Sequence, residues 1–186
     1  GHRRGISIPT MRTLQSVVYL PCELKARDLA SRLAIATHVV GNGYPVILGQ
    51  QWSIFTNLKR EVPPGCILFT TANAFQAGQI SRLRASGCIV LVSDQEALPF
   101  IGVGLLANVA PEAMAACDLF LAQSEAHKGV LMAAYPEAAD KITVVGSPRL
   151  DVLEATRTER PLAVPYILFN TNFALVNSIW GSEEKA

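Results

Sequence analysis

Two carboxylates, Asp94 and Glu96, follow the apolar run Cys-Ile-Val-Leu-Val and could do chemistry there. A carboxylate at the end of a buried strand can act as a general base on a sugar hydroxyl, or as a nucleophile at an anomeric carbon. The alternative is structural, because Ser93 or Asp94 could cap a following helix while Glu96 complements its dipole. We predict Asp94 and Glu96 as the candidate catalytic residues, with capping as the competing interpretation.

Charged residues also follow the first and last of the apolar runs. Glu23 and Arg27 stand four residues apart, a spacing that favours an ion pair on a helix. Arg27 could instead clamp a carboxylate or phosphate through two hydrogen bonds. In the stretch Gly-Ser-Pro-Arg-Leu-Asp (146–151), the Gly and Pro predict a rigid turn that presents Arg149 and Asp151 at the carboxyl end of a strand.

Three uncharged or titratable side chains complete the candidate substrate-binding set. Trp52 could stack on a sugar ring or be a half-buried aromatic residue. Gln123 belongs to a polar group after the fifth predicted strand, and His127 lies in the opening turn of the next helix. For His127, a solvated or capping role and a role as general acid both stay open.

These residues are positioned by short apolar runs that alternate with helical patterns. Strands are predicted at 16–20, 45–49, 66–70, 88–92, 119–122 and 142–145, and helical segments at 23–40, 74–86 and 125–134. In the first helix, the spacing places Leu29, Leu33 and Val40 on the buried side, with Asp28 and Arg32 on the other.

Strands that are apolar on both faces and separated by helices predict an α/β fold, a Rossmann-like parallel sheet with helices on both faces. We assign it to residues 14–152. In such a sheet, the loops after successive strands share one edge, which is where ligands bind. We therefore expect the candidate residues to gather around one cleft at that edge.

Composition and motif searches exclude several function classes. The net charge of +1 and the absence of a Lys/Arg cluster argue against nucleic-acid binding. Cys22, Cys66, Cys88 and Cys117 lack metal-ligand spacing, so no metal site is predicted; Cys22 is placed in a loop and the others are read as buried thiols. No Gly-rich dinucleotide or phosphate loop follows the first strand, so no bound cofactor is predicted.

Several motifs come in the order seen in bacterial surface carbohydrate biosynthesis proteins. They are Pro-Cys-Glu-Leu-Lys-Ala-Arg-Asp-Leu (21–29), Gly-Tyr-Pro-Val-Ile-Leu-Gly (43–49), Ser-Asp-Gln-Glu-Ala-Leu (93–98), Gly-Ser-Pro-Arg-Leu-Asp-Val-Leu (146–153) and Ile-Leu-Phe-Asn-Thr-Asn-Phe (167–173). The chain resembles this family, which is glycosyltransferase-like with GT-B architecture and looks related to the retaining Kdo transferases of capsule and lipopolysaccharide assembly.

The resemblance implies a domain organisation. Residues 1–13 would be a tag scar and flexible start, 14–152 the N-terminal, acceptor-side half of a GT-B protein, 153–164 a linker, and 165–186 the start of a truncated second domain. A chain that lacks the second half would be inactive alone. The strand expected at 165–173 would then dock on another copy or on the first domain's edge.

The same resemblance implies partners and a location. It implies a saccharide acceptor and, through the second half, a nucleotide-sugar donor, in a cytoplasmic protein. Peripheral association with the inner face of the bacterial membrane and homo-oligomerisation stay open. So do three other functions: a non-catalytic binding or scaffold module, a sugar-nucleotide epimerase and a glycerophosphotransferase.

Overall fold

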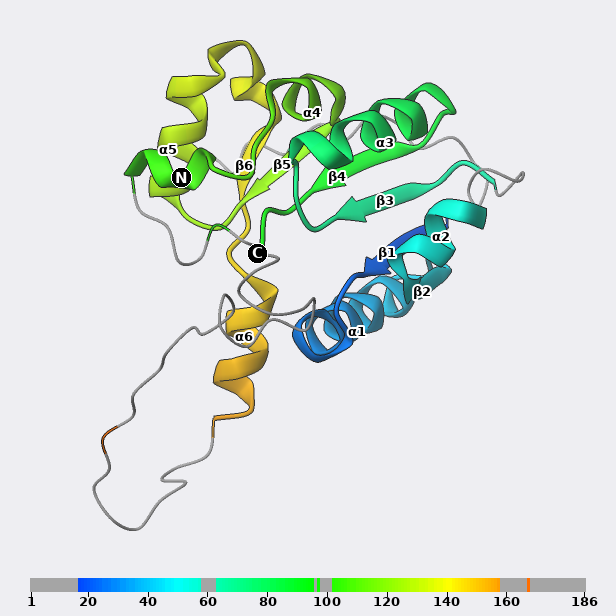
Figure 1. Cartoon of the computed structure of the whole chain (residues 1–186). Coiled ribbons are helices and arrows are strands. Elements are labelled where there is room, and N and C mark those ends of the chain that lie inside the picture. The colour runs from blue at the N-terminus through cyan, green and yellow to red at the C-terminus, as the bar shows by residue number, and fades with distance from the viewer. Residues whose placement is uncertain (1–16, 58–62, 96, 98–101, 158–166, 168–186) are drawn as a thin grey trace, which may run out of the picture. The chain divides into compact units, whose positions relative to one another are not determined.

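The computed structural model describes residues 17–57, 63–95, 97, 102–157 and 167 (Figure 1). The chain divides into two compact units, residues 1–155 and 156–186, and every described helix and strand lies in the first. The segment 1–13 that was expected to be a tag scar and flexible start, Glu96 and most of the strand expected at 165–173 lie outside the described residues. In the part of the chain that is described, no helix has the length and apolar character needed to cross a membrane.

Six strands form one sheet in which every pair is parallel. The strands are β1 (Val18–Cys22), β2 (Val46–Gln50), β3 (Cys66–Phe69), β4 (Ile89–Val92), β5 (Leu119–Ala122) and β6 (Ile142–Val144). Their order across the sheet is β2-β1-β3-β4-β5-β6. The predicted α/β, Rossmann-like fold is therefore confirmed.

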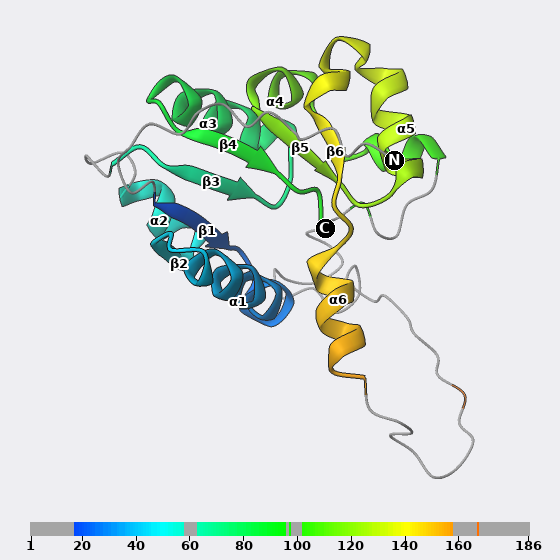
Figure 2. The same cartoon turned by 180° about the vertical axis from the view of Figure 1, so that it is seen from behind.

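Helices alternate with these strands along the chain (Figures 1 and 2). They are α1 (Lys25–Gly41), α2 (Gln51–Asn57), α3 (Ala74–Ala85), α4 (Pro111–Ala116), α5 (Glu125–Ala134) and α6 (Pro148–Ala155), with the 3-10 helices η1 (Gly102–Leu106) and η2 (Pro136–Lys141). Asn73 caps α3 and Ser124 caps α5, each accepting a backbone N–H three residues on.

One face of the sheet carries the main core. Alternate strand residues pack against apolar side chains of the helices that cover this face. The strand residues are Tyr19, Ile67, Phe69, Val90, Val92 and Phe120, and the helix residues include Ile54 and Phe55 of α2, Ile80 and Leu83 of α3, Met114 of α4 and Leu131 of α5. Because strand side chains alternate between faces, this arrangement places α2 to α5 together on one side.

Helix α1 covers the opposite face of the sheet. The side of α1 that was predicted to face solvent faces the sheet instead. Asp28, Ser31 and Arg32 are the buried residues of α1, whereas Leu33 and Val40 are exposed. The apolar spacing gave the wrong face because this helix lies over a polar gap in the sheet, described below. Tertiary context overrode the helical pattern here.

Three further predictions need correction. Cys22 is the buried last residue of β1 and not a loop residue. The loop expected after the second strand is α2, which starts at Gln51, directly after β2. The predicted turn at 146–151 is confined to its start, at Gly146, where φ is +84°. Pro148 begins α6, so Arg149 and Asp151 are helical residues and not turn residues. Pro is well suited to a first helical position because its φ is already close to the helical value.

Two glycines give a prediction about the fold. A Cβ on Gly65, just before β3, would clash with the carbonyl oxygen of Val17, whereas one on Gly78, inside α3, meets nothing within 4 Å. Gly65→Ala should therefore lower the free energy of unfolding by ~1–3 kcal/mol. Gly78→Ala should raise it by up to ~1 kcal/mol through helix propensity. Urea unfolding of both variants checks this, and a Gly65→Ala variant as stable as the wild type would contradict the close approach of Val17 to Gly65.

Candidate functional site

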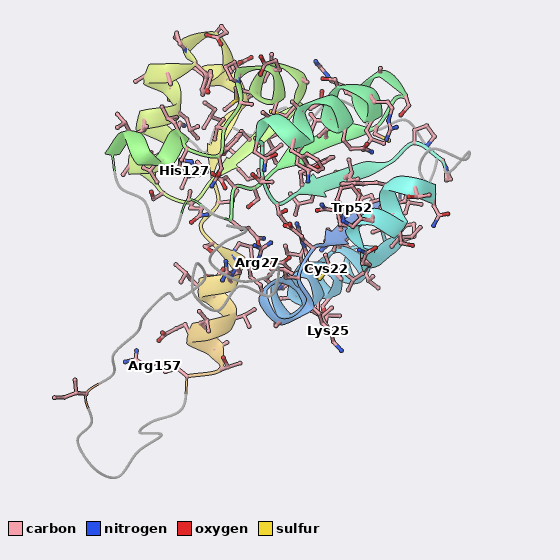
Figure 3. The ribbon with its side chains drawn as sticks, in the orientation of Figure 1. Cys22, Lys25, Arg27, Trp52, His127 and Arg157 are labelled. Atoms are coloured by element: carbon pink, nitrogen blue, oxygen red, sulfur yellow. The ribbon has the colours of Figure 1, made fainter. Side chains whose placement is uncertain are left out.

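The sheet order defines where a ligand can enter. From β1 the chain passes to β2 on one side, and then crosses to β3 on the other side of β1. The direction of winding reverses between β1 and β3, so their carboxyl ends form the topological switch point at which open α/β sheets bind ligands. Figure 3 labels Cys22, Arg27, Trp52 and His127, which end a strand or begin the helix that follows one.

Buried polar side chains gather at this carboxyl edge. They lie within five residues after the ends of β2, β3, β4, β5 and β6. These residues are Gln51, Thr70, Thr71, Ser93, Asp94, Gln95, His127 and Ser147. Because burying a polar group without a hydrogen bond is costly, their concentration at one edge marks it as the candidate site.

The segment after β4 is held firmly against its neighbours. The backbone N–H of Ser93 donates to Phe69 and that of Gln95 to Thr70, and the Gln123 side chain donates to the carbonyl oxygen of Asp94. These bonds fix Asp94, which is only 1% exposed, at the predicted edge. The predicted substrate-binding residue Gln123 therefore contacts the backbone of the predicted catalytic residue.

Several side-chain atoms here are buried and able to bond a ligand. Both amide atoms of Gln95, Oγ1 of Thr71, Oγ of Ser147 and Nε2 of His127 have no hydrogen-bond partner among the described residues. Leaving such atoms unbonded costs ~1–3 kcal/mol each. A polyhydroxylated ligand at this edge would satisfy donors and acceptors together, since an amide and a hydroxyl each offer both.

His127 is buried. The solvated position that the sequence analysis considered, as the alternative to a general acid, is therefore wrong. The side chain is 1% exposed, lies edge-on to Phe120, and its Nδ1 accepts the backbone N–H of Gln123 at 3.4 Å. Burial lowers the pKa of His127 below its usual value near 6.5. The neutral ring that accepts at Nδ1 carries its proton on Nε2, so it offers a donor to the edge.

Stability should depend on pH through His127. Because its folded-state pKa lies below the unfolded value, the unfolded chain binds more protons as the pH falls through about 6.5, and stability is lost below that pH. The melting temperature of the wild type should fall between pH 7.5 and 5.5, and His127→Gln should remove part of this dependence. His38→Gln is the matched control because His38 is exposed on α1. Equal pH profiles for wild type and His127→Gln would contradict a buried neutral His127.

The charged residues after β1 form an ion-pair network. Arg27 Nη2 lies 2.8 Å from Glu23 Oε2, which confirms the expected pair, and Arg27 Nε lies 2.6 Å from Asp28 Oδ1. Asp28 Oδ2 also accepts the backbone N–H groups of Glu23 and Leu24. Burial alone would raise the pKa of Asp28, but Arg27 and these N–H groups hold it below its usual range. Arg27 is therefore committed to fixing the β1–α1 connection.

Arg32 lies deeper, in the gap between β1 and β3. The two strands pair only at Val18↔Cys66 and Tyr19↔Ile67. The next residue of β1 that faces β3 is Pro21, which has no N–H to donate. Arg32 Nη2 donates to the carbonyl oxygen of Leu68 at 3.2 Å instead. The guanidinium thus replaces a bond that the sheet cannot make.

Arg32 brings a buried positive charge to the switch point, where it interacts with the carboxylate of Asp28. Its side chain is fully buried, Nε and Nη1 have no hydrogen-bond partner, and burial lowers its pKa to about 10. It is still protonated at neutral pH. The sequence pattern placed Arg32 on the solvent side of its helix and did not predict this role. The strand was predicted to end at residue 20, whereas β1 continues through Pro21, which leaves a neighbouring carbonyl without a backbone donor.

The other predicted site residues also follow strand ends. Trp52 lies in the first turn of α2 and is 53% exposed. Arg149 and Asp151 lie in the first turns of α6, after β6. Their convergence with Glu23, Arg27 and Asp94 around one cleft stays a prediction, as does the part assigned to Glu96.

The cysteines and the acidic residues give no sign of a metal centre. Among the described residues, no three His, Cys, Asp or Glu side chains come together to hold a metal ion. The four cysteines are free thiols. Burial raises the pKa of both Cys66 and Cys117 to about 11, as expected of buried thiols that stay protonated.

The parallel sheet and the polar side chains at its carboxyl edge define the class of protein, which is an α/β domain of Rossmann type. No family model, curated protein or solved structure matches the chain. The fold class is therefore what is established.

Proposed function

We propose that this domain is the acceptor-binding half of a glycosyltransferase that acts in the synthesis of bacterial surface polysaccharides. The observation that carries the proposal is Asp94, a buried carboxylate fixed at the end of β4 beside the unbonded amide of Gln95. A sugar hydroxyl bonded by Gln95 would lie within reach of a neighbouring carboxylate. The motif order shared with surface carbohydrate biosynthesis proteins supports the same reading.

In this proposal Asp94 takes the proton of the acceptor hydroxyl. The oxygen then forms a bond to the anomeric carbon of the donor sugar, and the bond from that carbon to the nucleotide breaks, so the nucleotide leaves with the electron pair. Arg32, buried at the switch point, supplies positive potential on the same edge. Arg149 would hold an acidic group of the sugar.

A second candidate is a saccharide-binding module without catalysis. The observation that favours it is the burial of Asp94 together with the Gln123 bond to its backbone, which would also suit a purely structural residue. The two candidates share the binding site and differ in whether Asp94 reacts.

Ligand-detected NMR on the purified chain tests the proposal. Oligosaccharides prepared from bacterial surface polysaccharides should show saturation transfer from the protein, and glycerol phosphate should not. Transfer to glycerol phosphate alone would favour a glycerophosphotransferase. A lack of transfer to every neutral and acidic oligosaccharide would contradict a saccharide-binding function.

A further inference from the structure

Two exposed aromatic rings touch at the carboxyl edge. Trp52 is 53% exposed and Phe75 is 73% exposed, and their ring centroids lie 5.9 Å apart at an interplanar angle of 81°. Trp52 belongs to the first turn of α2 and Phe75 to the first turn of α3. The nearly perpendicular rings therefore form a corner that is open to solvent.

The fold explains why two residues 23 positions apart meet here. α2 follows β2 and α3 follows β3, and these two strands flank β1 on either side. α2 and α3 therefore begin at the ends of two strands that have only β1 between them, and on the same face of the sheet, so their first turns meet. The ring pair thus lies by the carboxyl end of β1, at the topological switch point.

Buried aromatic residues pack against the exposed ring pair. Trp52 also contacts Phe55 edge-on, with centroids 6.5 Å apart, and Phe55 stacks on Phe69 at 5.2 Å. Phe55 and Phe69 are both buried in the core. The exposed pair is therefore built on a packed base, which lowers the entropy lost when a ligand binds.

The helical turns that carry the ring pair are polar but uncharged. α2 contains no charged residue, and α3 contains none before Arg82. The polar residues close to the two rings in the sequence have amide or hydroxyl side chains. They include Gln50, Gln51, Ser53, Thr71, Asn73 and Gln76. Amides and hydroxyls suit the hydroxyl groups of a neutral ligand.

A buried polar side chain lies four residues before Phe75 in the sequence. Thr71 follows β3 in the connection that leads to Phe75, is 4% exposed, and its Oγ1 has no hydrogen-bond partner among the described residues. A ligand that lies on the rings could bond this hydroxyl. Aromatic faces and hydrogen-bonding groups are the two kinds of surface that a sugar ring needs, for its C–H face and its hydroxyl rim.

We propose that Trp52 and Phe75 form a stacking platform for a neutral pyranose ring of the acceptor saccharide. The inference rests on the proposed function and specifies its substrate: the ring that lies at the β2–β1–β3 end of the edge carries no charge. The negative π face of the aromatic ring attracts the weakly positive C–H hydrogens of the sugar. Phe75 is the partner that sequence analysis did not identify for Trp52.

Tryptophan fluorescence tests the platform. In a Trp180→Phe background Trp52 is the one tryptophan left, so its emission reports on this corner. The probes are methyl pyranosides of glucose, galactose, mannose, N-acetylglucosamine and rhamnose, with sorbitol as the acyclic control. At least one pyranoside should change the emission in a saturable way, and sorbitol should not.

Substitutions then assign the response. Phe75→Ala should weaken the affinity about tenfold, the scale of losing one aromatic stacking contact. Val40→Ala is the matched control. Val40 is an exposed apolar residue in the last turn of α1, which leads to the start of β2 at the opposite edge of the sheet. Affinity should be unchanged in this control. An equal response to sorbitol, or no response to any pyranoside, overturns the platform.

Failure of the platform and failure of the proposed function are distinguishable. Saccharide binding seen by NMR, with unchanged Trp52 emission and full affinity in Phe75→Ala, overturns the platform and leaves the function standing. Binding that requires Phe75 supports the platform. If Asp94→Asn also keeps full transfer activity in an enzyme that joins this domain to a donor-binding half, the catalytic proposal is contradicted. Self-association that Phe75→Ala abolishes, without any response to pyranosides, would make this corner a protein contact and overturn the platform.

Discussion

Asp94→Asn should lower the rate of sugar transfer at least ~100-fold in an enzyme that joins this domain to a donor-binding half. The amide keeps the shape of the carboxylate but cannot take the proton of the acceptor hydroxyl. The backbone carbonyl of Asp94 bonds Gln123, and this contact does not involve the side chain. Affinity for the saccharide should therefore change much less than the rate, which steady-state kinetics and a binding titration measure separately.

Asp118→Asn is the matched control for this prediction. Asp118 directly precedes β5 and so lies at the opposite edge of the sheet, where its carboxylate accepts the backbone N–H of Val90 and pairs with Arg84. The same chemical change there should lower stability without changing the transfer rate of the folded enzyme. A full rate in Asp94→Asn would assign Asp94 to a structural role.

Arg32→Ala should lower the free energy of unfolding by roughly 2–5 kcal/mol, the range for truncating a large buried side chain. It opens a cavity between α1 and the sheet and leaves the Leu68 carbonyl without a donor. Arg32→Met should cost less, because it keeps most of the volume and also removes a charge that is expensive to bury. Urea denaturation of the two variants measures the difference.

Pro21 supplies a sharper test of the same contact. Pro21→Ala restores a backbone N–H at the position of β1 that faces Leu68, so it should recover about 1 kcal/mol when combined with Arg32→Ala. In the wild-type background it should give no such gain, because Arg32 already bonds the carbonyl. Additive effects in this double-mutant cycle would show that Arg32 does not substitute for the missing strand bond.

The fold was predictable from the sequence because its strands are continuous apolar runs. The strand at Leu119–Ala122 and the helix at Glu125–Ala134 have the predicted bounds, and the parallel sheet follows from the alternation of strands and helices. Three short helices were not predicted. α6 was taken for a turn and a linker, and α2 and α4 were missed because of their length. With seven and six residues, neither extends over two full turns, so their apolar spacing has too little length to be distinctive.

The candidate site was predictable only in outline. Its edge follows from the parallel sheet, and the Glu23–Arg27 pair follows from helical spacing. The burial of the polar face of α1 could not be predicted. Asp28 and Arg32 lie against a gap in the pairing of β1 with β3, and that gap depends on residues far away in the sequence. The contact of Trp52 with Phe75 could not be predicted either, because it depends on the order of the strands in the sheet.

Amide chemical-shift mapping shows which edge of the sheet binds a saccharide. An isotope-labelled chain is titrated with the oligosaccharide that gives the strongest saturation transfer. Shifts are expected at the carboxyl edge, with Gln51, Gln95 and Gln123 as reporters. The amides of Gly43, Gly65 and Gly87, which precede β2, β3 and β4 at the opposite edge, should not move. Shifts confined to that opposite edge, or none at saturating saccharide, would contradict a saccharide site at the carboxyl ends of the strands.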